Sequence, residues 1–133
     1  MGINAELWGS QAWHFIHSVA ITFPANPTET DKENYLQFFK SLENVLPCPF
    51  CAEHYKENMA KIPPRFDNSK ELFEWSVDMH NEVNKANNKP VLTYEEAYNE
   101  FEHNLNIDKY INRQNAEVKL LYNRLKNLKK WQM

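Results

Sequence analysis

The chain has 133 residues and a formal net charge of −3. This length allows one domain with a buried core, and the weak negative charge excludes a general nucleic-acid-binding surface, because phosphate affinity needs concentrated basic charge. No apolar run approaches the roughly 20 residues of a membrane span, and residues 1–7 lack the basic start and apolar core of a signal peptide. We therefore expect a soluble, unprocessed protein that binds neither nucleic acid nor membrane. With only two glycines and many helix formers and aromatics, the composition predicts an all-α fold.

The first expected helix runs from about Ala5 to Phe23. Its apolar residues recur at three- and four-residue steps, which places them on one broad face. They are Trp8, Ala12, Trp13, Ile16, Val19, Ala20 and Phe23. His17 lies beside this face, and alone it is most simply a core or boundary residue. Pro24 and Pro27 end the helix.

Four further helices are expected between residues 30 and 101. Thr30 with Glu33 and Thr93 with Glu96 fit the capping boxes that open two of them. The expected ranges are 30–45, 50–61, 69–87 and 94–101. Helices joined by such short, proline-rich connections pack naturally as an antiparallel four-helix bundle, with the short fifth helix across one end. We assign residues 1–103 to this domain.

Residues 104–133 differ in kind and are predicted to form a C-terminal helical extension. Heptad spacing relates five apolar residues there. They are Ile111, Val118, Leu121, Leu125 and Leu128. An amphipathic helix docked on the bundle would explain the pattern, and self-association or partner capture would explain it equally.

The two cysteines form the stretch around which the chain is organised, Cys48-Pro49-Phe50-Cys51. Pro49 fits the first position of a helix, so Cys48 is expected at a helix N-terminus, where the dipole and unpaired N–H groups stabilise a thiolate. Redox chemistry is the leading interpretation. An inert buried pair remains open, as does a zinc half-site with His54 and His80, although the histidine spacing does not match usual zinc modules. A purely structural disulfide between these cysteines would stabilise the fold little, because closing so short a loop removes little entropy from the unfolded chain.

A second constellation of polar residues lies between residues 75 and 90. His80 and Asn81 each share one side of the helix with Asn84, and Lys85 and Lys89 add positive charge. A solvated helix face would explain these residues. A planar, phosphate-bearing cofactor would also find hydrogen bonds and charge here, with aromatic surfaces supplied by the first helix.

Three motifs together resemble the Erv/ALR family of FAD-linked sulfhydryl oxidases. They are Trp8-Gly9-x-x-x-Trp13-x-Phe15-Ile16-His17, then Cys48-x-x-Cys51, then His80-Asn81-x-Val83-Asn84 with Lys89-Pro90. Their order and spacings match the family over about residues 6–103. The resemblance implies a helical bundle that holds FAD, with the CxxC disulfide beside the isoalloxazine. It also implies a thiol oxidase that forms disulfide bonds in protein substrates and passes the electrons through FAD to O2, giving H2O2.

The resemblance also implies roles for individual residues. Cys51 would be the flavin-proximal cysteine that forms the charge-transfer thiolate, and Cys48 the interchange cysteine that meets the substrate dithiol. The positions that match the family's cofactor contacts, with softer matches at Tyr55 and Phe101, are Trp8, Gly9, Trp13, His17, Tyr55, His80, Asn81, Val83, Asn84, Lys89 and Phe101. No metal is implied. The expected partners are a thiol-containing protein substrate or small dithiol relay protein, and a second copy of the chain in a homodimer.

The chain departs from cellular members of this family at several positions. Ser10 stands where they usually carry an arginine, and Val77 and Tyr94 occupy the positions of their structural disulfide. Glu100-Phe101 replaces an Arg-Trp pair, and no second cysteine pair exists to act as a shuttle. We therefore expect this chain to take electrons directly from a separate protein.

So minimal a form resembles the oxidases of large DNA viruses. A viral origin would place the protein in the host cytoplasm at virus assembly sites, and it could also enter the virion. The alternative function is a flavin-free helical interaction module in which the CxxC is passive and the C-terminal heptads bind a partner.

Overall fold

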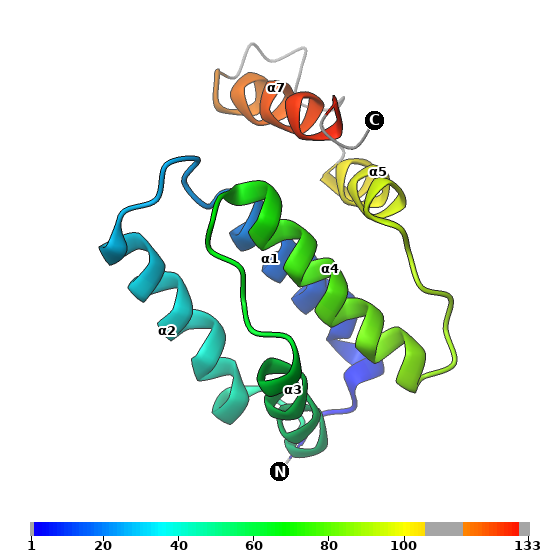
Figure 1. The fold of residues 1–133 in the computed structure, drawn as a ribbon. Helices are drawn as coiled ribbons and strands as arrows, with labels where there is room; N and C mark the ends of the chain where they lie inside the picture. The colour runs from blue at the N-terminus through cyan, green and yellow to red at the C-terminus, as the bar shows by residue number, and fades with distance from the viewer. Residues whose placement is uncertain (1, 106–115, 131–133) are drawn as a thin grey trace. The chain divides into compact units, whose positions relative to one another are not determined.

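The computed structural model describes residues 2–105 and 116–130, and the chain divides into two compact units, Met1–Pro90 and Val91–Met133. Every regular element among the described residues is helical, as Figure 1 shows, which confirms the all-α prediction. None of these helices is long and apolar enough to span a membrane. The placement of the fifth helix across the bundle and the domain boundary after residue 103 stay predictions.

The first unit contains a short 3-10 helix and four α-helices. In chain order they are η1 (Ala5–Leu7), α1 (Gly9–Ile21), α2 (Glu29–Val45), α3 (Pro49–Lys61) and α4 (Ser69–Ala86). α1 packs along α4, α2 packs against α3, and α3 also contacts α4 (Figure 1). The prediction of one unbroken helix from Ala5 is wrong at its start, because the Trp8 backbone leaves helical geometry at φ −134°.

α2 begins at a different capping box from the one predicted. Thr28, not Thr30, is the N-cap: its hydroxyl oxygen accepts from the Asp31 N–H at 3.0 Å, and the Asp31 carboxylate accepts from the Thr28 N–H at 2.9 Å. Both threonines have an acidic residue three positions later. The upstream box is the one formed, so the helix starts at Glu29 and Thr30 lies inside its first turn.

Aromatic residues join α2, α3 and α4 in the core. The Phe39 ring of α2 is fully buried and meets the Trp75 ring of α4 edge-on, with 4.8 Å between centroids. The Tyr55 hydroxyl of α3 donates to the Phe39 carbonyl at 2.6 Å, and the Trp75 indole N–H donates to the Ile62 carbonyl at 2.8 Å. These buried polar atoms are therefore satisfied, and their bonds fix how the three helices face one another.

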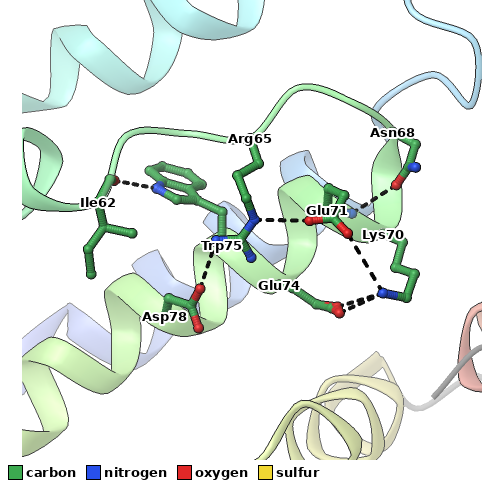
Figure 2. Close-up of polar contacts among 8 residues, drawn as sticks. All are labelled: Ile62, Arg65, Asn68, Lys70, Glu71, Glu74, Trp75 and Asp78. Carbon is green, nitrogen blue, oxygen red and sulfur yellow. Dashed lines mark hydrogen bonds and ion pairs between the residues drawn. The ribbon is translucent and has the colours of Figure 1, made fainter. Parts of the chain in front are cut away.

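Charged residues hold the connection between α3 and α4 against α4 itself, as Figure 2 shows. Arg65 donates to Glu71 at 3.0 Å and to Asp78 at 2.9 Å, one and a half to two turns apart along the helix. Lys70 donates to Glu74 at 2.8 Å, and Asn68 caps the helix by accepting from the Glu71 N–H at 2.9 Å. Single surface pairs stabilise little, but a connected set fixes the path of the loop.

The second unit contains α5 (Tyr94–Leu105) and α7 (Ala116–Lys130), which contact one another. The predicted Thr93–Glu96 capping box is confirmed, with bonds of 3.0 and 3.1 Å, and these bonds lower the pKa of Glu96. Leu125 and Leu128 are buried, as their heptad spacing predicts, and Lys129 pairs with Glu102 of α5. Ile111 and the side chain of Val118 lie outside the described residues.

Replacing Thr28 by alanine should lower the free energy of unfolding by about 1 kcal/mol, because the Asp31 N–H at the start of α2 loses its hydrogen-bond acceptor. Urea titration followed by far-UV circular dichroism measures this difference. Thr30→Ala is the matched control, since Thr30 is exposed and does not cap the helix. An equal loss in both variants would contradict the assignment of the cap to Thr28.

Candidate functional site

Cys48 is the N-cap residue of α3, as the sequence predicted. Its backbone is extended, with φ −137° and ψ 114°, and Pro49 takes the first helical position. The Cys48 sulfur accepts a hydrogen bond from the Cys51 N–H at 3.2 Å. Both residues are half-buried thiols, not joined by a disulfide, so the structure shows the reduced form of the pair.

The two thiols differ in acidity. Hydrogen bonds from the Cys51 thiol and from the Cys51 and Phe50 N–H groups lower the pKa of Cys48. Burial raises the pKa of Cys51 to about 11, and its bond to the Cys48 sulfur adds to this shift. The first thiolate of the reduced pair therefore forms at Cys48, which is the arrangement that a nucleophilic interchange cysteine needs.

The start of α1 lies beside the cysteine loop. The Trp8 indole N–H donates to the Ile3 carbonyl at 2.8 Å, and the Ile3 N–H donates to the carbonyl of Pro47, the residue before Cys48, at 2.7 Å. Ile3 thus links Trp8, where the first motif begins, to Pro47, the residue before the cysteine motif. A Cβ at Gly9 would meet no atom within 4 Å, so packing within the chain does not explain why glycine stands there.

A cluster of aromatic and imidazole rings fills the contact between α1 and α4. The Trp13 ring stacks on His80 with 4.3 Å between centroids and 4° between planes, and His17 lies 5.4 Å from His80. His17 also hydrogen-bonds through Nδ1 to Ser76 at 2.7 Å and through Nε2 to His80 Nδ1 at 3.2 Å. The structure therefore brings three of the predicted cofactor residues into direct contact.

The protons of this cluster can be assigned from its bonds. The Ser76 hydroxyl gives its hydrogen to the Phe73 carbonyl at 2.6 Å, so its oxygen accepts from His17 Nδ1–H. His17 Nε2 must then accept from His80 Nδ1–H, which leaves His80 Nε2 as an acceptor. Both rings are neutral in this assignment.

Burial agrees with neutral rings. It lowers the pKa of His17 to about 3, with further contributions from His80 and His14. It lowers the pKa of His80 to about 4, and the positive charge of Lys89 adds to the shift. Protonating either imidazole would place a charge in this interface with little solvent to stabilise it.

The remaining predicted residues of α4 lie toward its C-terminal end. The Asn84 amide, which is buried, donates to the Asn81 side chain at 3.3 Å, and the Asn84 carbonyl accepts from the Lys89 N–H at 2.8 Å. Val83 is half-buried on the same helix. Asn81 and Asn84 therefore share one side of α4, as the sequence predicted, and Lys89 follows just after the C-cap residue Asn87.

Tyr55 and Phe101 are the two softer matches among the predicted cofactor residues. Tyr55 is buried, and its hydroxyl is bonded to the Phe39 carbonyl between α2 and α3; burial and the Glu43 carboxylate raise its pKa. Phe101 is buried within the second unit. Their contacts with a cofactor stay predictions. Among the described residues, no group of three His, Cys, Asp or Glu side chains could hold a metal ion.

Ser76 is the residue that the sequence reasoning missed. It is completely buried and holds His17. The available signal was its spacing: Ser76 lies one turn before His80, so a small hydroxyl and an imidazole share one face of the most deeply buried helix.

The model of the Erv1/Alr family matches residues 10–105. The chain belongs to this family. It is 40% identical over 106 residues to a probable FAD-linked sulfhydryl oxidase of Acanthamoeba polyphaga mimivirus, covering 77% of this chain and 74% of the relative. An FAD-linked sulfhydryl oxidase of African swine fever virus is 31% identical over 98 residues, covering 74% of this chain and 82% of the relative.

Cellular relatives and solved structures agree with this Erv1/Alr assignment. The mitochondrial FAD-linked sulfhydryl oxidase ERV1 of Saccharomyces cerevisiae is 33% identical over 87 residues, which cover 65% of this chain and 46% of the relative. The crystal structure of the FAD binding domain of Erv1 from Saccharomyces cerevisiae matches with a TM-score of 0.66 and 32% identity, over 68% of this chain and 87% of that one. The chain is thus similar to the core of the yeast protein and spans less than half of its full length.

The neutral imidazoles predict how stability depends on pH. Because the folded pKa values of His17 and His80 lie below the ordinary 6.5, the unfolded chain binds protons that the folded chain does not. The free energy of unfolding should therefore fall as the pH drops from 7 to 5, with each such histidine contributing up to about 1.4 kcal/mol per pH unit.

Urea titrations at several pH values measure this slope. Between pH 6 and 5, His80→Gln should reduce the slope of the unfolding free energy by up to about 1.4 kcal/mol per pH unit, which corresponds to one proton. The carboxylates contribute alike to the wild-type protein and to the variant. An unchanged slope would mean that His80 is charged in the folded protein.

Proposed function

We propose that the protein is an FAD-dependent sulfhydryl oxidase that forms disulfide bonds in protein substrates and transfers the electrons to O2. The observation that supports this most strongly is the pair Cys48–Cys51 at the start of α3, in which the pKa of the Cys48 thiol is lowered. The pair lies in a chain of the Erv1/Alr family. The names of the relatives from mimivirus, yeast and African swine fever virus support the same activity.

The residues present fit an FAD cofactor. A flavin nucleotide offers planar rings, ribose hydroxyls and phosphates, and the α1–α4 contact offers the aromatic face of Trp13, the acceptor Nε2 of His80 and the Asn81 and Asn84 amides. Lys89, close enough to depress the pKa of His80, supplies positive charge for a phosphate. The open space beside Gly9 would allow a bound group to approach the backbone of α1.

We propose that the remaining predicted positions complete this cofactor site. Trp8, the N-cap residue of α1, would line it together with His17 of α1 and Val83 of α4, and Tyr55 would add an aromatic contact from α3. His17 acts mainly through His80, since both of its ring nitrogens are already bonded within the chain.

The cysteines carry out the thiol chemistry. In the oxidised enzyme, a substrate thiolate attacks the Cys48 sulfur, the Cys48–Cys51 bond breaks, and Cys51 leaves with the electron pair. A second substrate thiolate then attacks the substrate sulfur of the mixed disulfide and releases Cys48, so the substrate loses two electrons and the enzyme pair gains them. The low pKa of Cys48 favours this release, because a more acidic thiol is a better leaving group.

The reduced pair must then be reoxidised. Bound FAD supplies this chemistry by accepting the two electrons and passing them to O2, which yields H2O2. Cys51, as the flavin-proximal residue, first has to lose its proton, and its hydrogen bond to the Cys48 sulfur provides a short path for that proton.

The partners and site of action are part of the proposal. Lacking a second cysteine pair, the chain receives electrons directly from a thiol-containing protein or a small dithiol relay protein. Exposed Phe15 on α1 and Leu36 on α2 offer apolar surface for a homodimer. The viral relatives support action in the host cytoplasm at virus assembly sites and in the virion; recovery only from the mitochondria of uninfected cells would contradict this.

Replacing Cys51 by serine should abolish the O2-dependent oxidation of dithiothreitol, because the enzyme then has no Cys48–Cys51 disulfide for the dithiol to attack. The variant should keep its flavin and should still form a stable mixed disulfide at Cys48 with a disulfide reagent, detected by mass. Cys48→Ser is the matched control, which should lose both reactions. Wild-type turnover in Cys51→Ser would refute the flavin-proximal role.

A visible spectrum of the purified protein from about 350 to 600 nm tests the cofactor itself. The protein should be yellow, and dithiothreitol in air-free buffer should bleach the flavin band. A colourless protein that also takes up no added FAD would favour the alternative, a flavin-free interaction module with a passive CxxC.

A further inference from the structure

The residues around Cys48 leave its loop with little conformational freedom. Proline rings fix φ at Pro47 and Pro49, and a residue before proline is restricted to extended conformations. Cys48 has such a conformation, with φ −137° and ψ 114°. The main torsion left in this tripeptide is ψ of Pro47, which sets the direction of the Pro47 carbonyl and of the peptide bond that leads into Cys48.

Residues 2–4, which we name the strap, hold that carbonyl. The Ile3 N–H donates to the Pro47 oxygen at 2.7 Å. The strap is held in turn, because the Ile3 carbonyl accepts from the Trp8 indole at 2.8 Å and the Asn4 side chain caps η1 by accepting from the Glu6 N–H at 2.9 Å. The strap is thus anchored to the helix start on one side and to the cysteine loop on the other.

Gly2 lets the strap lie directly on the loop. A Cβ at this position would come within 2.8 Å of the Pro49 Cδ atom, 3.6 Å of the Pro47 oxygen and 3.7 Å of the Cys48 Cα atom. The proline ring is closed and cannot bend away as a flexible side chain would. A larger residue therefore requires the strap or the loop to shift, which would disturb the hydrogen bond from Ile3 to Pro47.

We propose that Gly2 and the Ile3 N–H are positioning elements of the thiol chemistry: they fix the Pro47 carbonyl and thereby hold the Cys48 sulfur against the N–H groups that begin α3. The proposal rests on the proposed oxidase function for its effect on turnover. Its effect on Cys48 itself does not require a flavin.

Two chemically different variants of the full chain test this role. Gly2→Ala adds one methyl group at the contact, and Ile3→Pro removes the donor. Iodoacetamide alkylates Cys48 in the reduced protein at pH 7, and peptide mass quantifies the product. In both variants this alkylation should slow about tenfold, as expected for a misplaced reacting group. The value of kcat/KM for dithiothreitol should fall by a similar factor. Flavin content should stay at the wild-type level.

Leu7→Ala is the control, because it removes an exposed apolar side chain from the same part of the chain and should change neither rate. A lower melting temperature with wild-type alkylation of Cys48 in both variants would overturn the proposal, and so would faster alkylation. Hydrogen exchange of the Ile3 amide in the wild-type protein provides a test that needs no variant: protection supports the strap, and exchange at the free rate overturns it.

The outcomes separate this proposal from the oxidase itself. A wild-type protein without dithiol turnover would contradict the proposed function, yet the alkylation rates would still decide whether the strap positions Cys48. Normal turnover with equal alkylation rates in the wild-type protein and all variants would support the oxidase function and would show that the strap does not position Cys48.

Discussion

The hydrogen bonds that run from Ser76 through His17 to His80 are the constraint on which the α1–α4 contact depends. An interface built only of apolar side chains would bind these helices without fixing the orientation of any ring. Here the Ser76 hydroxyl, committed to the Phe73 carbonyl, determines both imidazole tautomers. The consequence is a stack of Trp13 on a neutral His80 whose remaining ring nitrogen is an acceptor. Such an interface holds its aromatic faces in place before any ligand arrives.

The sequence predicted the helices and most of their starts, because the signals for these are local. Proline after Cys48 indicated a helix N-terminus, and the Thr93–Glu96 spacing indicated a cap; the structure confirms both. Thr28 and Thr30 show the limit of such signals, since two overlapping boxes compete and only one can start the helix. The contacts Ile3–Pro47 and His17–Ser76 join residues far apart in the chain, and no periodicity or motif reports which distant groups will meet.

The cysteine pair illustrates why family membership and local geometry are both needed. A CxxC at a helix start fits redox chemistry on any of several folds, so the motif alone does not name a cofactor. The α1–α4 cluster adds the aromatic and amide groups, and the Erv1/Alr match places both on one helical core. The opposite pKa shifts of the two thiols support the proposed roles, since the more acidic Cys48 suits exchange with a substrate and the more buried Cys51 suits transfer within the enzyme.

A protein proposed to make disulfides in a reducing host cytoplasm faces the problem that its own fold cannot depend on one. Val77, where the family resemblance implies a cysteine of the structural disulfide of cellular members, is buried here. The α3–α4 connection is held by Arg65 between Glu71 and Asp78, and by the Trp75 indole on the Ile62 carbonyl. None of these bonds is a disulfide, so a reducing cytoplasm leaves the α3–α4 connection held beside the cysteine pair.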